Sequence, residues 1–142
     1  MAADGRFKTP SGRFRFPPAL DDDPVLPSVE FPFHLIALAS EDAINSQVRD
    51  ERRAAGAVTA RVNAGVARAR GFGDGDMARL VSPRGALPVR LECRDDVRAD
   101  SVFVAKGDWA MYGRVLNVLT EPRYTAGSGT AFNQNYVRLE PA

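Results

Sequence analysis

Few side chains in this sequence could act as a nucleophile, a general base or a metal ligand. The 142 residues include one histidine, His34, and one cysteine, Cys93. A single cysteine excludes an intrachain disulfide, and one histidine with one cysteine is not a metal-ligand set. His34 lies in an apolar run without a recognisable serine or cysteine partner, so we expect a core histidine rather than a base. Cys93 is expected to be a small buried hydrophobe, and no catalytic or metal-binding residue is predicted.

After His34 and Cys93, the segment from Gly71 to Asp76, Gly-Phe-Gly-Asp-Gly-Asp, is the next candidate for binding a ligand. A phosphate-binding glycine loop would be followed by Lys-Ser/Thr and a helix, whereas this one precedes an alternating apolar segment. Its glycines permit positive φ and its acids cap and solvate a turn. We expect a structural turn. Trp109 and Tyr112 could stack on a flat ring, but we expect them in the core or an interface.

Short apolar or alternating segments predict that strands dominate the elements around these residues. A further run, Arg13–Phe16, is suited to one edge strand, and Pro83-Arg84-Gly85 forms a tight turn between two of the main segments. Several short strands with frequent turns favour a small barrel over a doubly wound sheet. The main predicted strands cover residues 31–39, 56–62, 77–82, 86–91, 101–106 and 133–140.

Other segments predict one or two short helices and a long N-terminal arm. Ala64–Arg70 is rich in alanine and stops at a glycine, as a short helix does. Ile44–Val48 is expected to form a turn or helical stretch, and residues 107–117 a loop. Five prolines lie in residues 1–30, which we predict to be an extended arm. Residues 31–142 are then the barrel domain.

Composition narrows the class of partner. With 44% hydrophobic residues the chain can bury the core of one domain, and its net charge of +1 does not suggest nucleic acid or a membrane surface as partner. No apolar run approaches the ~18 residues of a spanning helix, and the first residues lack the apolar segment of a secretion signal. We expect a soluble protein, in the cytoplasm rather than exported.

Several motifs follow one another along the chain in a recognisable order. Phe7–Phe16 is similar to a linker F-x-T-P-S-G-K-x-E-F, and Ile44–Val48 to L-N-S-x-F. The segment from Asn63 to Gly85 resembles N-P-x-D-A-x-x-x-G-I-x-D-G-D-x-V-x-V-x-S-x-x-G. Asn117–Thr120 is similar to N-x-L-T, and the tail to Y-x-x-x-x-V-x-V-E. In this order the motifs resemble the C-terminal domain of the dimethyl sulfoxide reductase family of molybdopterin oxidoreductases, which implies a double-psi β-barrel, in agreement with the barrel predicted from the strands.

The sequence also departs from the family pattern. Ala64 stands where proline is usual and Gly65 where an acid is common, so the start of the short helix is expected to be weaker. The residues after the first strand, Ser40-Glu41-Asp42, lack the arginine that many members carry there.

The resemblance implies binding of molybdopterin guanine dinucleotide by loops that cover the cofactor, while the metal ligand lies in other domains. Amides can pair with the adjacent donors and acceptors of pterins and guanine, and hydroxyls can donate to diphosphates. Capping, turn formation and left-handed geometry are the structural alternatives for these residues. The implied contacts are Ser40, Asn45, Ser46, Gln47, Asn117, Thr120, Asn133, Gln134 and Asn135.

We therefore expect the C-terminal domain or small subunit of a molybdenum or tungsten oxidoreductase, not catalytic alone, with the remaining domains or subunits as partners. The alternative is a protein-interaction module on a double-psi barrel without cofactor. A self-processing enzyme would need cleavage at Gly127-Ser128, which would leave most of the barrel upstream. Substrate, redox partner and the choice of metal are not encoded in these motifs.

Overall fold

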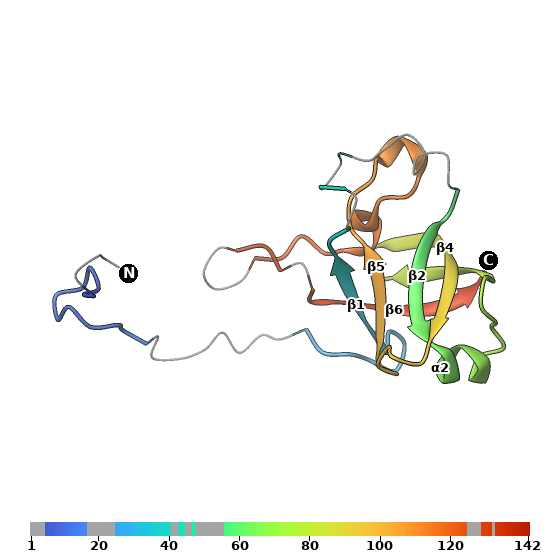
Figure 1. The fold of residues 1–142 in the computed structure, drawn as a ribbon, viewed down its shortest axis with the longest axis horizontal. Coiled ribbons are helices and arrows are strands. Elements are labelled where there is room, and N and C mark those ends of the chain that lie inside the picture. Colours follow the sequence, from blue (N-terminus) through green and yellow to red (C-terminus); the bar gives the residue numbers. More distant parts are fainter. Residues whose placement is uncertain are drawn as a thin grey trace.

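The structure, a computed structural model, describes residues 5–16, 25–40, 43–44, 47, 56–124, 129–131 and 133–142. Within these residues the chain forms a closed barrel of six strands, with one α-helix and two 3-10 turns (Figure 1). The strands are β1 (Phe33–Leu38), β2 (Val58–Asn63), β3 (Met77–Ser82), β4 (Gly85–Arg94), β5 (Ser101–Ala105) and β6 (Asn135–Pro141). The helical elements are α2 (Ala64–Ala69), η1 (Ala110–Tyr112) and η2 (Leu116–Leu119).

The strands follow the order β1-β5-β2-β4-β3-β6 around the barrel. β1 pairs in parallel with β5, and β2 in parallel with β4, while β2 and β5 run antiparallel between these pairs. Parallel neighbours that are not consecutive in the chain require long crossovers, as expected of a double-psi barrel. The predicted mainly β barrel is confirmed.

Alternation of apolar and polar residues explains which side chains fill the barrel. In β4 the buried positions Leu87, Val89 and Leu91 alternate with exposed Ala86, Pro88 and Arg90. Successive side chains of a strand point to opposite faces, so every second residue enters the interior. The same pattern buries residues of every other strand, and together they form one core.

Helix α2 begins where the sequence predicted it, despite the absence of proline at Ala64. The Asn63 side chain accepts a hydrogen bond from the Val66 N–H at 3.1 Å and donates to the Val97 carbonyl at 2.8 Å. An asparagine at this position satisfies one of the N–H groups that the first turn leaves unpaired. Gly71, with φ of 80°, follows the helix as the predicted stop.

The glycine-aspartate segment after α2 is structural, as predicted. Asp76 Oδ2 accepts from the Gly73 N–H at 2.7 Å, and Asp74 Oδ1 accepts from the Cys93 N–H at 2.8 Å. The Gly75 N–H donates to the Leu91 carbonyl at 2.9 Å, and the Asp76 carbonyl accepts from the Leu91 N–H at 2.9 Å. The Asp74 carboxylate and the two main-chain bonds to Leu91 therefore fasten this turn to β4, while the Asp76 carboxylate closes the turn itself.

Three local predictions are corrected. Arg13–Phe16 forms no strand; Phe14 instead packs edge-to-face on Phe7 and Phe16, which pairs the rings without a neighbouring strand. The loop at residues 107–117 contains η1 and the start of η2. Trp109 and Tyr112 are exposed on the η1 loop, so a location in the core is wrong, while the other predicted location, an interface, stays a prediction.

The segment just before β1 is attached to the barrel. Arg138 Nη1 lies 2.6 Å from Glu30 Oε1, and its guanidinium lies 5.0 Å from the centroid of the Phe31 ring. The extended arm over residues 1–30 and the domain boundary at residue 31 remain predictions. Among the described residues no helix has the length and apolar character needed to cross a membrane.

Candidate functional site

A groove of about 600 Å³, which we call the η2 groove, lies beside η2. The helical turns drawn in orange, which follow β5 in the chain, lie at the barrel end opposite α2 (Figure 1). The groove is bordered by the end of β5, by the turn between β3 and β4, and by the segment that follows η2. Its lining includes Ala37, Arg84, Lys106, Gly107, Asp108, Val115, Leu116, Asn117, Thr120, Glu121, Pro122, Thr130 and Ala131.

Two of the predicted contact residues, Asn117 and Thr120, line this groove together. Leu116 and Leu119 are buried at 3% and 1% exposure and anchor η2 to the core, which leaves Asn117 exposed between them. Thr120 Oγ1 donates to the Asn117 carbonyl at 3.3 Å, so part of its hydrogen-bonding capacity closes the turn. The Asn117 amide forms no hydrogen bond with another described residue. Its donor and acceptor both remain available to a ligand.

The other predicted asparagines bond the main chain beside the groove. Asn133 Oδ1 accepts from the Ala37 N–H at 3.1 Å, and its carbonyl accepts from His34 Nε2. Asn135 is 4% exposed, and its Oδ1 accepts from the Glu121 N–H at 2.9 Å. These contacts extend the antiparallel pairing of β1 with β6 and hold the segment after η2. Both asparagines therefore position groove residues.

Gln134 faces a different hollow. With Asn135 it lines a pocket of about 200 Å³, whose other walls include Leu26, Phe31, Leu119 and Glu121. Glu121 also lines the η2 groove, so the two hollows are neighbours. The Gln134 side chain is exposed.

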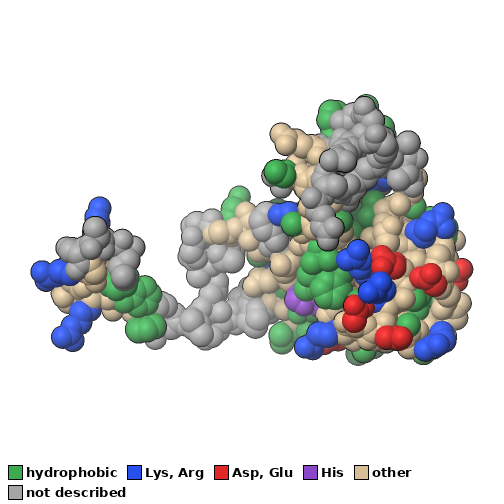
Figure 2. Space-filling view, in the orientation of Figure 1, with side chains coloured by type: hydrophobic (Ala, Val, Ile, Leu, Met, Phe, Trp, Pro, Cys, Tyr) green, Lys and Arg blue, Asp and Glu red, His purple; other side chains and the backbone are tan. Residues whose placement is uncertain are grey.

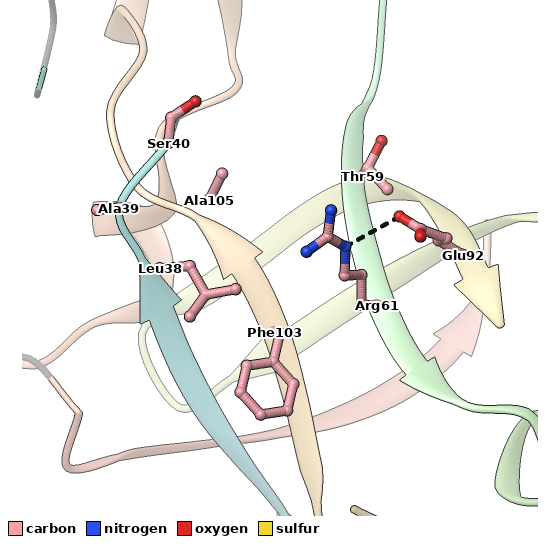
Figure 3. Close-up of a pocket in the computed structure, with 8 residues that line it drawn as sticks. All are labelled: Leu38, Ala39, Ser40, Thr59, Arg61, Glu92, Phe103 and Ala105. Carbon is pink, nitrogen blue, oxygen red and sulfur yellow. Dashed lines mark hydrogen bonds and ion pairs between the residues drawn. The ribbon is translucent and has the colours of Figure 1, made fainter. Parts of the chain in front are cut away.

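Ser40 lies apart from Asn117, in a hollow of about 500 Å³ on the outer side of β1, β5 and β2 (Figure 3). Leu38 and Phe103 form its apolar wall, and Arg61 points at Glu92 across it with Nε and Oε2 3.0 Å apart. That ion pair neutralises the charge in this hollow.

The remaining predicted contacts follow Ser40 in the chain. Gln47 is exposed, and its N–H donates to the Ile44 carbonyl at 2.9 Å, which agrees with the predicted turn. Asn45 and Ser46 lie outside the described residues.

A buried ion pair holds the loop between the two hollows. Arg114 Nε lies 3.2 Å from Asp108 Oδ2, and the two side chains are only 10% and 6% exposed. Arg114 Nη1 also donates to the Gly56 carbonyl at 3.1 Å, and Asp108 Oδ1 accepts from the Trp109 N–H at 2.7 Å. Asp108 has φ of 139°, a conformation that its surrounding contacts must maintain. The pair therefore fixes where η1 and the groove wall lie.

Sequence analysis missed two cations of the η2 groove, Arg84 and Lys106. Arg84 was assigned only to a turn and Lys106 only to the end of a strand. Arg84 directly precedes β4 and Lys106 directly follows β5, and the order of the strands brings them to the same end of the barrel as Asn117. The sequence pattern does not contain the strand order, so it could not place these residues together.

His34 and Cys93 have structural contacts. His34 is half-buried on the outer side of β1, because Phe33 and Leu35 take the inward positions, so its predicted core location is wrong. Its ring stacks on Tyr136 with centroids 5.2 Å apart. Cys93 packs against the core, as predicted. Burial, with the nearby Asp74 and Asp76 carboxylates, raises the pKa of the Cys93 thiol and keeps it protonated.

Charges of both signs are distributed over the barrel face seen in Figure 2. Arg61, Glu92, Arg94 and Asp96 form neighbouring ion pairs across β2 and β4. Exposed pairs of this kind contribute little to stability and leave no strong single-sign field. In the part of the chain that the structure describes, no cluster of three or more His, Cys, Asp or Glu side chains is arranged to hold a metal.

Comparisons with known proteins concern the fold and the family. Acetylene hydratase from Pelobacter acetylenicus has a similar fold, with a TM-score of 0.66 and 15% identity. The match covers 80% of this chain and 19% of the hydratase, so the chain spans about a fifth of that protein. No curated protein sequence matches. The family model of the molybdopterin dinucleotide-binding domain matches residues 33–136, which include β1, η2 and the start of β6, and the chain belongs to this family.

Proposed function

We propose that the η2 groove binds the guanine nucleotide part of a molybdopterin guanine dinucleotide. The observation that carries this proposal is the convergence of Asn117 and Thr120 on one groove of about 600 Å³ in a chain of this family. Grooves of this volume bind ligands of nucleotide size. The Asn117 amide can pair with the adjacent acceptor and donor of the guanine edge, and Thr120 has a hydroxyl for a ribose or phosphate oxygen.

The other predicted contacts have different roles in this proposal. Gln134 is a further contact at the neighbouring pocket, while Asn133 and Asn135 position the groove through their bonds to Ala37 and Glu121. The segment after β1 contacts another part of the cofactor in this proposal, through Ser40, Asn45, Ser46 and Gln47.

The chain acts, in this proposal, as the C-terminal domain or small subunit of a molybdenum or tungsten oxidoreductase. The bound cofactor supplies the redox chemistry, and this domain supplies binding and orientation. The exposed side chains of Trp109, Met111 and Tyr112, at 40%, 75% and 43%, form an apolar surface on the η1 loop. Apolar surface of this kind is suited to contact with the rest of the enzyme. The length of the acetylene hydratase chain beyond the matched region supports a larger assembly.

A titration of the 142-residue chain with GDP tests the proposal, with ADP as the matched ligand that keeps the diphosphate and changes the base. We expect GDP to bind more tightly than ADP and to shift the amide signals of Asn117 and Thr120 in NMR spectra. N117A should lower GDP affinity about threefold to tenfold, the effect of one or two lost hydrogen bonds.

V118A is the control, because Val118 is the next residue of η2 and its side chain is 43% exposed. It should bind GDP like the unmodified chain. Equal affinities for GDP and ADP, with N117A unchanged, would contradict recognition of guanine by this groove. That result would favour the alternative of a protein-interaction module.

A further inference from the structure

Residues 25–31, which we call the strap, lead into β1 along the surface of the barrel (Figure 1). A turn within the strap orders them. The Phe31 N–H donates to Ser28 Oγ at 3.0 Å, and the Ser28 N–H donates to the Phe31 carbonyl at 3.3 Å. Both partners belong to the strap, so the turn does not depend on contact with the barrel.

A single side chain of the barrel bonds the strap. Arg138 of β6 donates from Nη1 to Glu30 Oε1 at 2.6 Å, and its guanidinium lies 5.0 Å from the centroid of the Phe31 ring. Among the described residues, no other hydrogen bond or ion pair joins residues 25–31 to the barrel. The pairing of β1 with β6 begins only at Phe33. We call the contact of Arg138 with Glu30 and Phe31 the clasp.

Opening the clasp would leave Arg138 with a second carboxylate partner. Arg138 Nε lies 2.6 Å from Glu140 Oε1, and Glu140 Oε2 lies 2.9 Å from Arg79 Nη2. Breaking an ion pair is costly mainly when it leaves a buried charge uncompensated. Here Arg138 keeps Glu140, and the Glu30 side chain, which is already 66% exposed, becomes fully solvated. The ionic part of the clasp is therefore weak and sensitive to salt.

The strap is not close-packed on the barrel. A pocket of about 200 Å³ lies between them, with Leu26 and Phe31 on the side of the strap and Pro83 and Leu119 on the side of the barrel. Protein interiors are filled close to crystalline density, so two surfaces with a space of this size between them share few dispersion contacts. Leu26 and Val29 are exposed and add little to the packing. The clasp is therefore the main contact that keeps the strap on the barrel.

We propose that the strap is a conformational switch, closed while Arg138 holds Glu30 and released from the barrel when this clasp breaks. The switch does not depend on which ligand the η2 groove binds. Its release uncovers the apolar wall that Pro83 and Leu119 form, and Leu119 belongs to η2, the turn that carries Asn117. The strap is the covalent link between residues 1–24 and β1, so a displacement of the preceding chain acts on the clasp before it reaches the barrel.

Backbone ¹⁵N relaxation of the 142-residue chain tests the proposal, with E30Q as the variant that breaks the clasp. At low salt the amides of residues 29 and 30 in the unmodified chain should have order parameters of about 0.85, as rigid backbone does, and E30Q should lower them below about 0.6. Added salt should lower them in the unmodified chain and change E30Q little. ANS, a dye that binds exposed apolar surface, should fluoresce more strongly with E30Q.

E140Q is the matched control, because it removes the other carboxylate that binds Arg138 and leaves the clasp in place. It should keep the strap at least as rigid as in the unmodified chain and leave ANS fluorescence unchanged. E92Q removes an exposed carboxylate from the ion pair with Arg61 and should also leave the strap closed. Thermal unfolding of each variant shows whether the barrel is intact.

Three results would overturn the proposal. If E30Q stays as rigid as the unmodified chain, the packing of Leu26 and Phe31 holds the strap without the clasp. If residues 29 and 30 of the unmodified chain are already mobile at low salt, the clasp does not close the strap. If E140Q releases the strap as E30Q does, the effect belongs to the charge of β6 and not to the contact of Arg138 with Glu30.

Discussion

The two ends of the barrel differ in how some of their polar side chains are used. At the end with α2, the side chains of Asn63, Asp74 and Asp76 all bond main-chain groups. At the end with η1 and η2, Asn117 and Arg84 face a groove without such partners among the described residues. Asn117 and Arg84 are exposed, so their hydrogen-bonding groups face water in the free protein and can pair with a ligand instead.

The groove end also contains the buried ion pair of Asp108 with Arg114. D108N should produce the largest effect, a loss of about 3 kcal/mol in the free energy of unfolding, because it removes the carboxylate charge that is paired with the buried Arg114 guanidinium. Urea unfolding measures this loss. E92Q, which breaks the exposed pair with Arg61, should cost less than about 1 kcal/mol. Equal stability of D108N and E92Q would show that the buried pair does not hold the loop.

Two glycines, one at each end, sharpen the comparison. G85A should destabilise the chain by about 1 to 3 kcal/mol and weaken GDP binding, because the added Cβ would lie 2.9 Å from the Val118 carbonyl oxygen and forces η2 away from the turn. At Gly73 a Cβ would have its nearest neighbour at 3.5 Å, an ordinary contact, so G73A should be nearly neutral in both measurements. Thermal unfolding and GDP titration distinguish them. A neutral G85A would mean that η2 can shift without consequence.

Removal of the α2 cap should affect stability alone. N63A loses the hydrogen bonds to Val66 and Val97 and should lower the free energy of unfolding by about 1 to 2 kcal/mol. GDP affinity should be unchanged, since Asn63 caps α2, which lies at the far end of the barrel (Figure 1). N117A should show the reverse pattern, normal stability with weaker binding. Reduced GDP affinity in N63A would argue that the two ends are coupled.

The smallest predicted effect is a pH dependence at the α2 end. The Arg98 guanidinium and the Ser101 hydroxyl hold the pKa of Asp100 well below its usual range. The folded chain therefore binds this proton less readily than the unfolded chain, so the contribution of Asp100 is present above about pH 4 and declines as pH falls below it. D100N should flatten the acid side of the stability curve measured by thermal unfolding. An identical curve for D100N would assign the acid dependence to other carboxylates.

Local patterns predicted most of the barrel because each strand buries every second residue. The alternation in Met77–Ser82 and in Gly85–Arg94, separated by a proline-glycine turn, was sufficient to predict that hairpin. α2 was predicted from its alanine-rich sequence and terminal glycine. Arg13–Phe16 shows the weakness of the same method, because alternation also occurs where no neighbouring strand accepts the backbone bonds.

The candidate site could be predicted only in part. Family resemblance selected Asn117 and Thr120, which share one groove, but it placed Ser40 and Gln134 in the same set although they line other hollows. Arg84 was missed because its place in the groove depends on a contact between the β3–β4 turn and η2.

The sequence alone determined the strand content, the position of α2, the structural role of the glycine-aspartate turn and the family resemblance. Each depends on residues close together in the chain, where spacing is enough. Tertiary structure alone decided which polar side chains form hydrogen bonds within the protein and which face the groove. That division depends on strand order, which brings Arg84, Lys106 and Asn117 to one end of the barrel and sets the main-chain partners of Asn133 and Asn135.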